Sequence, residues 1–489
     1  METVAQSNIG MYKQPRPFYM VFFIEMWERF GYAGLQTVLA MFLVKSIGMS
    51  DVEAFAIFGA FYAMVNGYVA IGGYIGDHIL GTKRTIVLGG ITLLIGYVII
   101  GLAGADKMSV FTGIACVAVG NGLFKANPAS LLSKIYAKDD PRLDGAFTLY
   151  HMAINTGAFM AMILVPMLGG RFGAQTGFFV CAAGLVLSLC TFVFYRNIVK
   201  DIDSPPGKLP LPKMKLMVII VGVIATIYLS AWMLTNLAVA HWLLAIVGTG
   251  VFVRFFYEAF KRTGLERSKM LAAFVLMLEA IAFFVIGQQM PTSLNFFTIN
   301  NVEHTVWGIR ITDPESFQAL NPFWIIVASP ILAYFYSYFG KQGKDLTIPA
   351  KFATGMVCCA VSFLVLVLGI TTANAQGLVS VWWLVSSYFF SSVGELMISG
   401  LGLAMVAKLV PQEMVGFTIG AWYLSSATAG VISGKVASFA AVPKGMTDSL
   451  QTLPIYFGAF MKMGIGVGII ALLVLALVPV LRKMIHEQN

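Results

Sequence analysis

The stretch GGYIGDHILGTKR, Gly72–Arg84, is a glycine-rich, charged turn that joins two long apolar segments, at about 54–80 and 85–104. Each segment has the ~20 mainly apolar residues that a helix needs to cross a bilayer. A charged turn between two such segments indicates a helical hairpin that crosses a membrane twice.

The same pattern continues along the whole chain of 489 residues, of which 58% are hydrophobic and 11% are charged. Soluble domains carry about 25% charged residues, so the composition excludes a soluble enzyme or nucleic-acid binder. A window of ~19 residues finds fourteen apolar segments. They lie at about 18–44, 54–80, 85–104, 108–133, 145–169, 173–195, 216–234, 237–260, 270–297, 322–340, 352–372, 379–407, 414–438 and 456–481. We therefore expect an all-α integral membrane protein.

The net charge of +9 is explained by topology. If the N-terminus is cytoplasmic, 22 of the 32 lysines and arginines fall on the cytoplasmic side, six fall outside and four lie within segments. This bias predicts that both termini are cytoplasmic. The basic face would contact anionic lipids rather than nucleic acid. All five cysteines lie inside apolar segments, where they are expected to act as small hydrophobic residues and to bind no metal.

Two charged connections divide the fourteen segments into groups of six, two and six. The connections are Arg196–Lys215 and Lys261–Lys269. We predict an N-terminal six-helix bundle (1–196), a linker with two inserted transmembrane helices (197–267) and a C-terminal six-helix bundle (268–489). The Gly72–Arg84 turn resembles the G-x-x-x-D-(R/K)-x-G-(R/K)-(R/K) loop of the major facilitator superfamily, whose fold consists of two such bundles.

Five charged residues interrupt the apolar segments: Glu25, Glu28, Arg29, Lys125 and Glu395. A charge at the centre of a span costs about 2.5–3.5 kcal/mol, so these residues must face one another or water, and such groups are functional by default. The first three stand at i, i+3 and i+4 of one helix and share a face. A substrate anion that takes Arg29 would leave a neighbouring carboxylate free to bind a proton.

Lys125 stands between two glycines and a proline in GNGLFKANP, Gly120–Pro128, and Glu395 has the opposite sign in the second half of the chain. One half thus suits an anion and the other an ammonium group, as a zwitterionic substrate requires. Asn155, Gln289, Asn321 and Trp422 are further candidates for the cavity wall. Each of the three amides could instead bridge neighbouring helices, and Trp422 could be a core aromatic residue.

Over essentially its whole length the sequence resembles the proton-dependent oligopeptide transporter family of the major facilitator superfamily, and its bacterial dipeptide and tripeptide permeases in particular. The matching motifs are E-x-x-E-R-F (Glu25–Phe30), G-N-G-L-F-K (Gly120–Lys125), the run Phe147–Gly157, P-T-S-L-N (Pro291–Asn295), N-P-F-W (Asn321–Trp324) and G-E-L (Gly394–Leu396).

The resemblance implies a role for each matching position. Glu25, Glu28, Arg29 and Lys125 would couple proton and peptide movement. Arg29 and Lys125 would receive the peptide carboxylate, with Tyr32 in the same site. Asn155, Asn321 and Glu395 would bind the amino end, and Gln289 and Trp422 would line the cavity.

Four positions depart from the family pattern: Ala33, Asn66, His151 and Gly287 each stand where relatives carry an aromatic residue. We expect a roomier and wetter cavity than in a generic dipeptide carrier. Substrate preference would then shift toward bulkier or modified peptides.

The sequence thus predicts a proton-coupled symporter of the bacterial inner membrane that imports di- and tripeptides by alternating access. We expect no enzymatic activity and no cofactor except protons as the coupling ion, because the sequence has no phosphate-binding P-loop and no spacing typical of a catalytic nucleophile or of metal ligands. We also expect a monomer. Alternatives are a carrier of the same fold for a modified peptide, a peptide-like metabolite or nitrate, and a membrane enzyme or channel.

Overall fold

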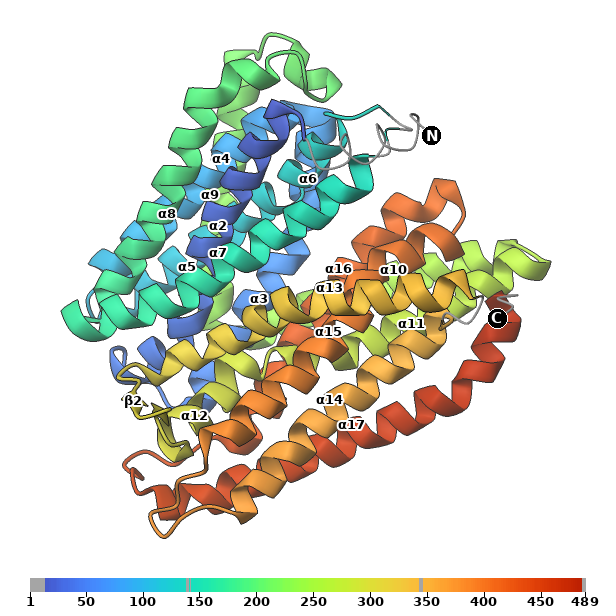
Figure 1. Ribbon diagram of the computed structural model, residues 1–489. Coiled ribbons are helices and arrows are strands. Elements are labelled where there is room, and N and C mark those ends of the chain that lie inside the picture. Colours follow the sequence, from blue (N-terminus) through green and yellow to red (C-terminus); the bar gives the residue numbers. More distant parts are fainter. Residues whose placement is uncertain (1–13, 138–139, 141, 343–345, 486–489) are drawn as a thin grey trace, which may run out of the picture. The chain divides into compact units, whose positions relative to one another are not determined.

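The structure is a computed structural model that describes residues 14–137, 140, 142–342 and 346–485 (Figure 1). Helices dominate because a backbone inside a bilayer must satisfy its own hydrogen bonds. The described residues form two compact units. The first consists of residues up to 39 together with 64–236, and the second of 40–63 together with residues from 237 onward.

The helices α2 and α3 continue from one unit into the other. The elements up to residue 236 are α2 (Arg16–Lys45), α3 (Asp51–Tyr74), the π-helix η1 (Ile75–Leu80), α4 (Thr82–Leu102), α5 (Lys107–Lys125), α6 (Asn127–Ser133), α7 (Arg142–Phe172), α8 (Ala174–Tyr195), the short 3₁₀-helices η2 (Arg196–Val199) and η3 (Pro205–Lys208), and α9 (Lys213–Thr235).

The second unit adds a small hairpin to its helices. Its elements from residue 237 are α10 (Leu237–Lys261), α11 (Gly264–Gly287), the π-helix η4 (Met290–Leu294), α12 (Asn295–Asn301), β1 (Thr305–Val306), β2 (Ile309–Arg310), η5 (Pro314–Ala319), α13 (Leu320–Lys341), α14 (Ile348–Thr371), α15 (Val381–Leu409), η6 (Gln412–Met414), α16 (Val415–Ala437), η7 (Ser438–Ala440) and α17 (Ser449–Ile485). The two strands pair antiparallel with Thr305 opposite Arg310.

Within the described residues, thirteen helical stretches are long and apolar enough to cross a membrane. The 30-residue helix α2 is a further one by length, and it carries the three charges of the E-x-x-E-R-F motif. The structure therefore confirms the fold class as a multi-spanning all-α membrane protein. Helices α9 and α10 are the least buried, and their exposed apolar side chains suit contact with lipid.

The two helices of the predicted insertion fall into different units. Helix α9 packs on α5 in the first unit, and α10 packs on α11 and α16 in the second. The boundaries 1–196, 197–267 and 268–489 stay a prediction.

Two spans that the sequence indicates as continuous are interrupted. The segment 108–133 is divided at Ala126 into α5 and α6, and Pro128 lies in the first turn of α6, which begins at Asn127. The segment 270–297 is divided after Gly287, where Pro291 lies in the following π-helix. Both interruptions place predicted site residues, Lys125 and Gln289, beside irregular backbone.

Close helix packing depends on glycine in the first unit. Helices α4 and α5 approach so closely that a Cβ atom on Gly120 would lie 2.6 Å from the backbone nitrogen of Leu93 and 3.0 Å from the carbonyl oxygen of Gly89. Such contacts hold α5, and with it Lys125, against its neighbours.

The Gly72–Arg84 turn is fixed by the connection that follows α8. Ser204 and Asp203 accept hydrogen bonds from the backbone N–H groups of Thr82 and Lys83 at the start of α4 (3.1 and 3.4 Å). Asp77 forms an ion pair with Lys134 (2.9 Å). Asp77, the acidic residue of the turn, therefore binds a lysine, and Asp203, which lies outside the turn, accepts from the start of α4.

Candidate functional site

One group of candidate residues is built on one turn of α2 in the first unit. Arg29 Nε lies 2.5 Å from Glu28 Oε2 and 3.4 Å from Glu25 Oε1. All three side chains are buried. Glu25 stands four residues before Arg29, so both share one face of the helix. The adjacent Glu28 reaches the same guanidinium nitrogen.

Two polar residues complete this cluster. Asn121 Nδ2 donates to Glu28 Oε1 (2.9 Å), and the hydroxyl of Tyr150 donates to the carboxylate of Glu25. Neither was a predicted site residue. The signal for Asn121 is its position four residues before Lys125, which places both on one face of α5; Tyr150 lies in the motif Phe147–Gly157.

Three polar atoms of the cluster have no hydrogen-bond partner among the described residues: Nη2 of Arg29, Oε2 of Glu25 and Oδ1 of Asn121. An unsatisfied buried guanidinium nitrogen costs free energy. A carboxylate of a ligand would satisfy it, because guanidinium and carboxylate groups pair through two parallel hydrogen bonds. The ring of Tyr32 covers the same guanidinium, with 5.1 Å between Arg29 Cζ and the ring centroid.

Lys125 is the last residue of α5, where the helix dipole favours a cation. Its Nζ donates to Oδ1 of Asn66 (3.1 Å), one of the four positions expected from the sequence to depart from the family pattern. Asn66 thus acts as a polar neighbour of the lysine rather than as a ring wall.

The other predicted residues of the first unit lie on α7 and α2. Asn155 Nδ2 donates to the carbonyl oxygen of His151 one turn earlier on α7 (3.0 Å), and His151 is itself exposed. Ala33 is buried in α2. Thus the first unit gathers Glu25, Glu28 and Arg29 into one cluster and places Lys125 on Asn66.

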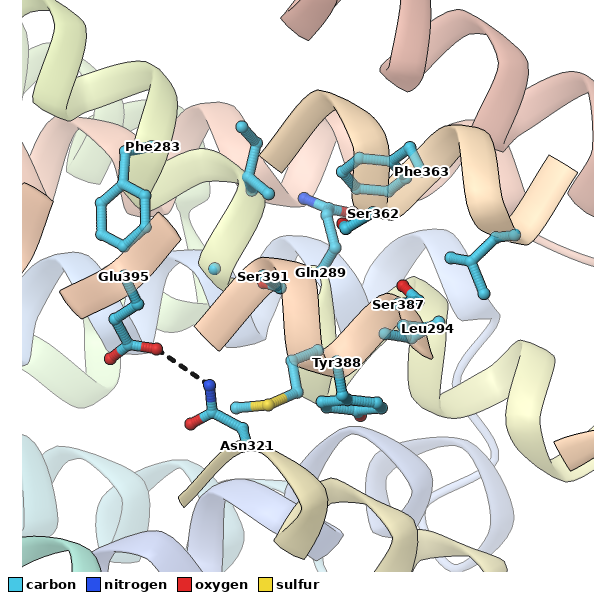
Figure 2. A pocket seen from close by; sticks show the side chains of 14 residues that line it. Phe283, Gln289, Leu294, Asn321, Ser362, Phe363, Ser387, Tyr388, Ser391 and Glu395 are labelled. Atoms are coloured by element: carbon cyan, nitrogen blue, oxygen red, sulfur yellow. Dashed lines mark hydrogen bonds between the residues drawn. The ribbon is translucent and has the colours of Figure 1, made fainter. Parts of the chain in front are cut away.

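A separate group of candidate residues lies in the second unit, where α13 meets α15. Asn321 Nδ2 donates to Glu395 Oε2 (2.9 Å) and to Ser392 Oγ (3.2 Å). Figure 2 shows this pair at the edge of a cavity of about 40 Å³. That volume holds roughly three water molecules.

The cavity has a mixed lining of aromatic and aliphatic side chains, serines and amides (Figure 2). It is lined by Phe283, Ile286, Gly287, Gln289, Met290, Leu294, Asn321, Ser362, Phe363, Leu366, Ser387, Tyr388, Ser391 and Glu395. Three predicted residues, Gln289, Asn321 and Glu395, thus share one cavity with the departure Gly287. A Cβ atom on Gly287 would meet no other atom within 4 Å. The serines and Tyr388 were missed, since isolated hydroxyl residues in apolar spans have no distinguishing pattern.

Gln289 and Trp422 have structural contacts of their own. Gln289 Nε2 donates to the carbonyl oxygen of Val285 (2.9 Å), and its Oε1 accepts from Ser293 (2.8 Å), which supports the helix interruption. The ring of Trp422 packs edge-on against Phe284 (centroids 5.6 Å apart). Trp422 does not line this cavity.

Comparisons with known proteins agree with this architecture. Residues 83–454 match the model of the POT family. The chain is 51% identical to dipeptide and tripeptide permease A of Proteus mirabilis over 99% of this chain and 98% of that protein. It is 50% identical to dipeptide and tripeptide permease B of Salmonella typhimurium over 99% of both.

Solved structures show the same fold. A bacterial homologue of the human drug peptide transporters PepT1 and PepT2 superposes with a TM-score of 0.85 at 35% identity, over 96% of this chain and 98% of that one. Tetrameric PepTSo2 gives a TM-score of 0.85 at 34% identity, over 96% and 99%. Because the family model matches residues 83–454 and these relatives match nearly end to end, the chain belongs to the POT family.

Proposed function

We propose that this protein is a symporter that imports di- and tripeptides together with protons by alternating access. The observation that carries the proposal is the buried Arg29, which two carboxylates hold while its Nη2 has no hydrogen-bond partner among the described residues. The names of the relatives support the peptide substrate, and one similar structure is described as a proton dependent oligopeptide transporter.

Charge complementarity assigns the two ends of a peptide. Its carboxylate binds Arg29 and Lys125 in the first unit. Its amino group binds Glu395 in the second unit, with Asn321 and Asn155 as further partners. A zwitterion needs both signs, whereas nitrate would need only the cations.

Proton coupling follows from competition for Arg29. When the peptide carboxylate takes the guanidinium, Glu25 or Glu28 loses its counter-charge and binds a proton. When the peptide leaves, the arginine returns to the carboxylates and the proton is released. Each charge that moves down 100 mV contributes about 2.3 kcal/mol, and each unit of pH gradient about 1.4 kcal/mol per proton.

Gly287 favours larger substrates than dialanine within this function. Gly287 lines the same cavity as Glu395, and a Cβ atom on Gly287 would meet no other atom within 4 Å. We infer that a bulky side chain of the peptide occupies this space. Asn66, Ala33 and His151 act in the same direction, because each removes an aromatic wall.

The setting of the transporter follows from the charge distribution. We place it in the inner membrane of a bacterium, with both termini cytoplasmic and the basic face against anionic lipid. The transport unit is one chain, since a single chain carries both the anion-binding and the amine-binding residues. The molar mass measured by light scattering in detergent distinguishes a monomer from a tetramer.

Reconstituted protein tests the function. Proteoliposomes with an acidic outside should take up labelled dialanine saturably, and collapse of the proton gradient should abolish accumulation. Lys125→Ala should abolish driven uptake. Unsaturable flux would instead indicate a channel.

A further inference from the structure

A second buried carboxyl group lies outside the cluster of α2. Glu279 of α11 is 4% exposed. Neither of its carboxyl oxygens has a hydrogen-bond partner, and no described residue forms an ion pair with it. A buried carboxylate without a partner is costly, so such a group is held in its neutral form or performs a task that requires it.

Helix periodicity connects Glu279 to the cavity. Phe283 and Ile286, which line the cavity, follow Glu279 at i+4 and i+7 and therefore share its face of α11. Glu279 lies one turn beyond the cavity, toward the N-terminal end of α11. That end adjoins the charged segment Lys261–Lys269, which the sequence assigns to the cytoplasm.

A cysteine links Glu279 to the carboxylate of the peptide site. Cys359 of α14 lies close enough to both Glu279 and Glu395 to interact electrostatically with each. A Cβ atom on Gly394, the residue before Glu395, would lie 2.8 Å from its sulfur. The helices α10, α14, α15, α16 and α17 all pack on α11. Among the described residues of these five helices, Cys359 is the titratable group that interacts with Glu279. No lysine or arginine described on these helices forms an ion pair with Glu279.

We propose that Glu279 is a proton-binding residue of the C-terminal half, one helical turn from the peptide site, which takes up one proton and releases it during each transport cycle. The step moves only a proton: the carboxylate becomes a carboxylic acid and returns. This proposal rests on the proposed function and adds a coupling site to it. Glu279 contributes to coupling by binding and releasing a proton, and it does not contact the peptide.

The test compares two modes of transport in the same proteoliposomes. Driven accumulation of dialanine under a gradient of one pH unit depends on every coupled proton. Exchange of internal for external dialanine at equal pH requires binding and the conformational change but no net proton flux. In Glu279→Gln the accumulation ratio should fall about tenfold, because one proton over one pH unit is worth that factor. Exchange should stay near the wild-type rate.

Two variants sharpen the result. Glu279→Asp keeps a carboxyl group and should restore driven accumulation. Glu266→Gln is the matched control, because this residue is an exposed carboxylate in the first turn of the same helix. It should behave as the wild type in both modes. If Glu279→Gln does not assemble, Glu279→Met gives the same readout without a buried polar group.

Three results separate the possible failures. Unchanged driven accumulation in a neutral Glu279 variant would overturn the proposal. Loss of exchange together with accumulation in both neutral variants would overturn it as well, because it would show a structural role. Absence of any peptide uptake by the wild type would instead refute the function on which the proposal rests.

Discussion

Asn321 donates a hydrogen bond of 2.9 Å to Glu395, although 74 positions separate them in the chain. The contact joins α13 to α15 at the wall of the cavity. It leaves the carboxylate oriented and still able to accept from an ammonium group. Under the proposed function, Glu395 is the residue of the second unit expected to distinguish a peptide from a simple anion.

Replacement of this carboxylate should weaken binding of the amino end selectively. Glu395→Gln should raise KM for dialanine about tenfold to hundredfold, the range expected when a charged hydrogen bond is lost. N-acetylated dialanine, which has no ammonium group, should be transported equally by both proteins. Glu413→Gln, an exposed carboxylate, serves as the control. Equal losses for both substrates would exclude recognition of the amino group by Glu395.

The guanidinium of Arg29 should be indispensable, and a lysine should not replace it. Arg29→Lys keeps the charge but loses the planar group that contacts both Glu25 and Glu28 through Nε and leaves Nη2 for a ligand carboxylate. Driven uptake should fall on the order of hundredfold, as for truncation of a buried charge pair. Arg254→Lys, which alters an exposed arginine in α10, should transport normally. Uptake by Arg29→Lys close to the wild type would show that charge alone suffices.

Filling the space beside Gly287 should change substrate preference. Gly287→Leu should leave transport of dialanine nearly intact and raise KM for a peptide with a bulky side chain about tenfold, the typical effect of a small steric change in a pocket. Competition with a peptide library measures the shift. Gly466→Leu, at an exposed glycine of α17 that also faces open space, is the control. An unchanged order of preference would remove Gly287 from the substrate site.

The close contact between α4 and α5 predicts a stability defect. Gly120→Ala places a methyl group 2.6 Å from the backbone nitrogen of Leu93 and should reduce stability by about 1–3 kcal/mol, as overpacking does. Thermal unfolding in detergent measures it. Gly222→Ala in α9, where nothing lies within 4 Å, should be neutral. Equal melting of both variants would contradict the packing.

Contacts within one helix are the part of the site that the sequence predicts best, because they depend on helix periodicity. The spacing of Glu25, Glu28 and Arg29 requires a shared face once the segment is helical, and the structure shows the ion pairs. Contacts between helices are harder, because an apolar span does not indicate which neighbour it meets. The sequence names Asn321 and Glu395 separately, but only the fold joins them.

A proline in the sequence does not by itself indicate whether a helix is interrupted there. Pro128 and Pro291 lie at the two interruptions of predicted spans. Pro166 and Pro330, by contrast, lie inside the continuous helices α7 and α13. A proline leaves a backbone carbonyl group of the preceding turn without its hydrogen bond. Whether the helix continues depends on whether neighbouring helices or side chains satisfy that carbonyl group, and the sequence of one segment does not reveal this.

The most direct test of coupled transport measures proton movement itself. A pH-sensitive dye inside proteoliposomes should report acidification when dialanine is added outside without an imposed pH gradient. The signal should be saturable and absent in Lys125→Ala, and reversing the peptide gradient should reverse it. Uptake of labelled dialanine at the normal rate with no change in internal pH would contradict proton-coupled peptide import.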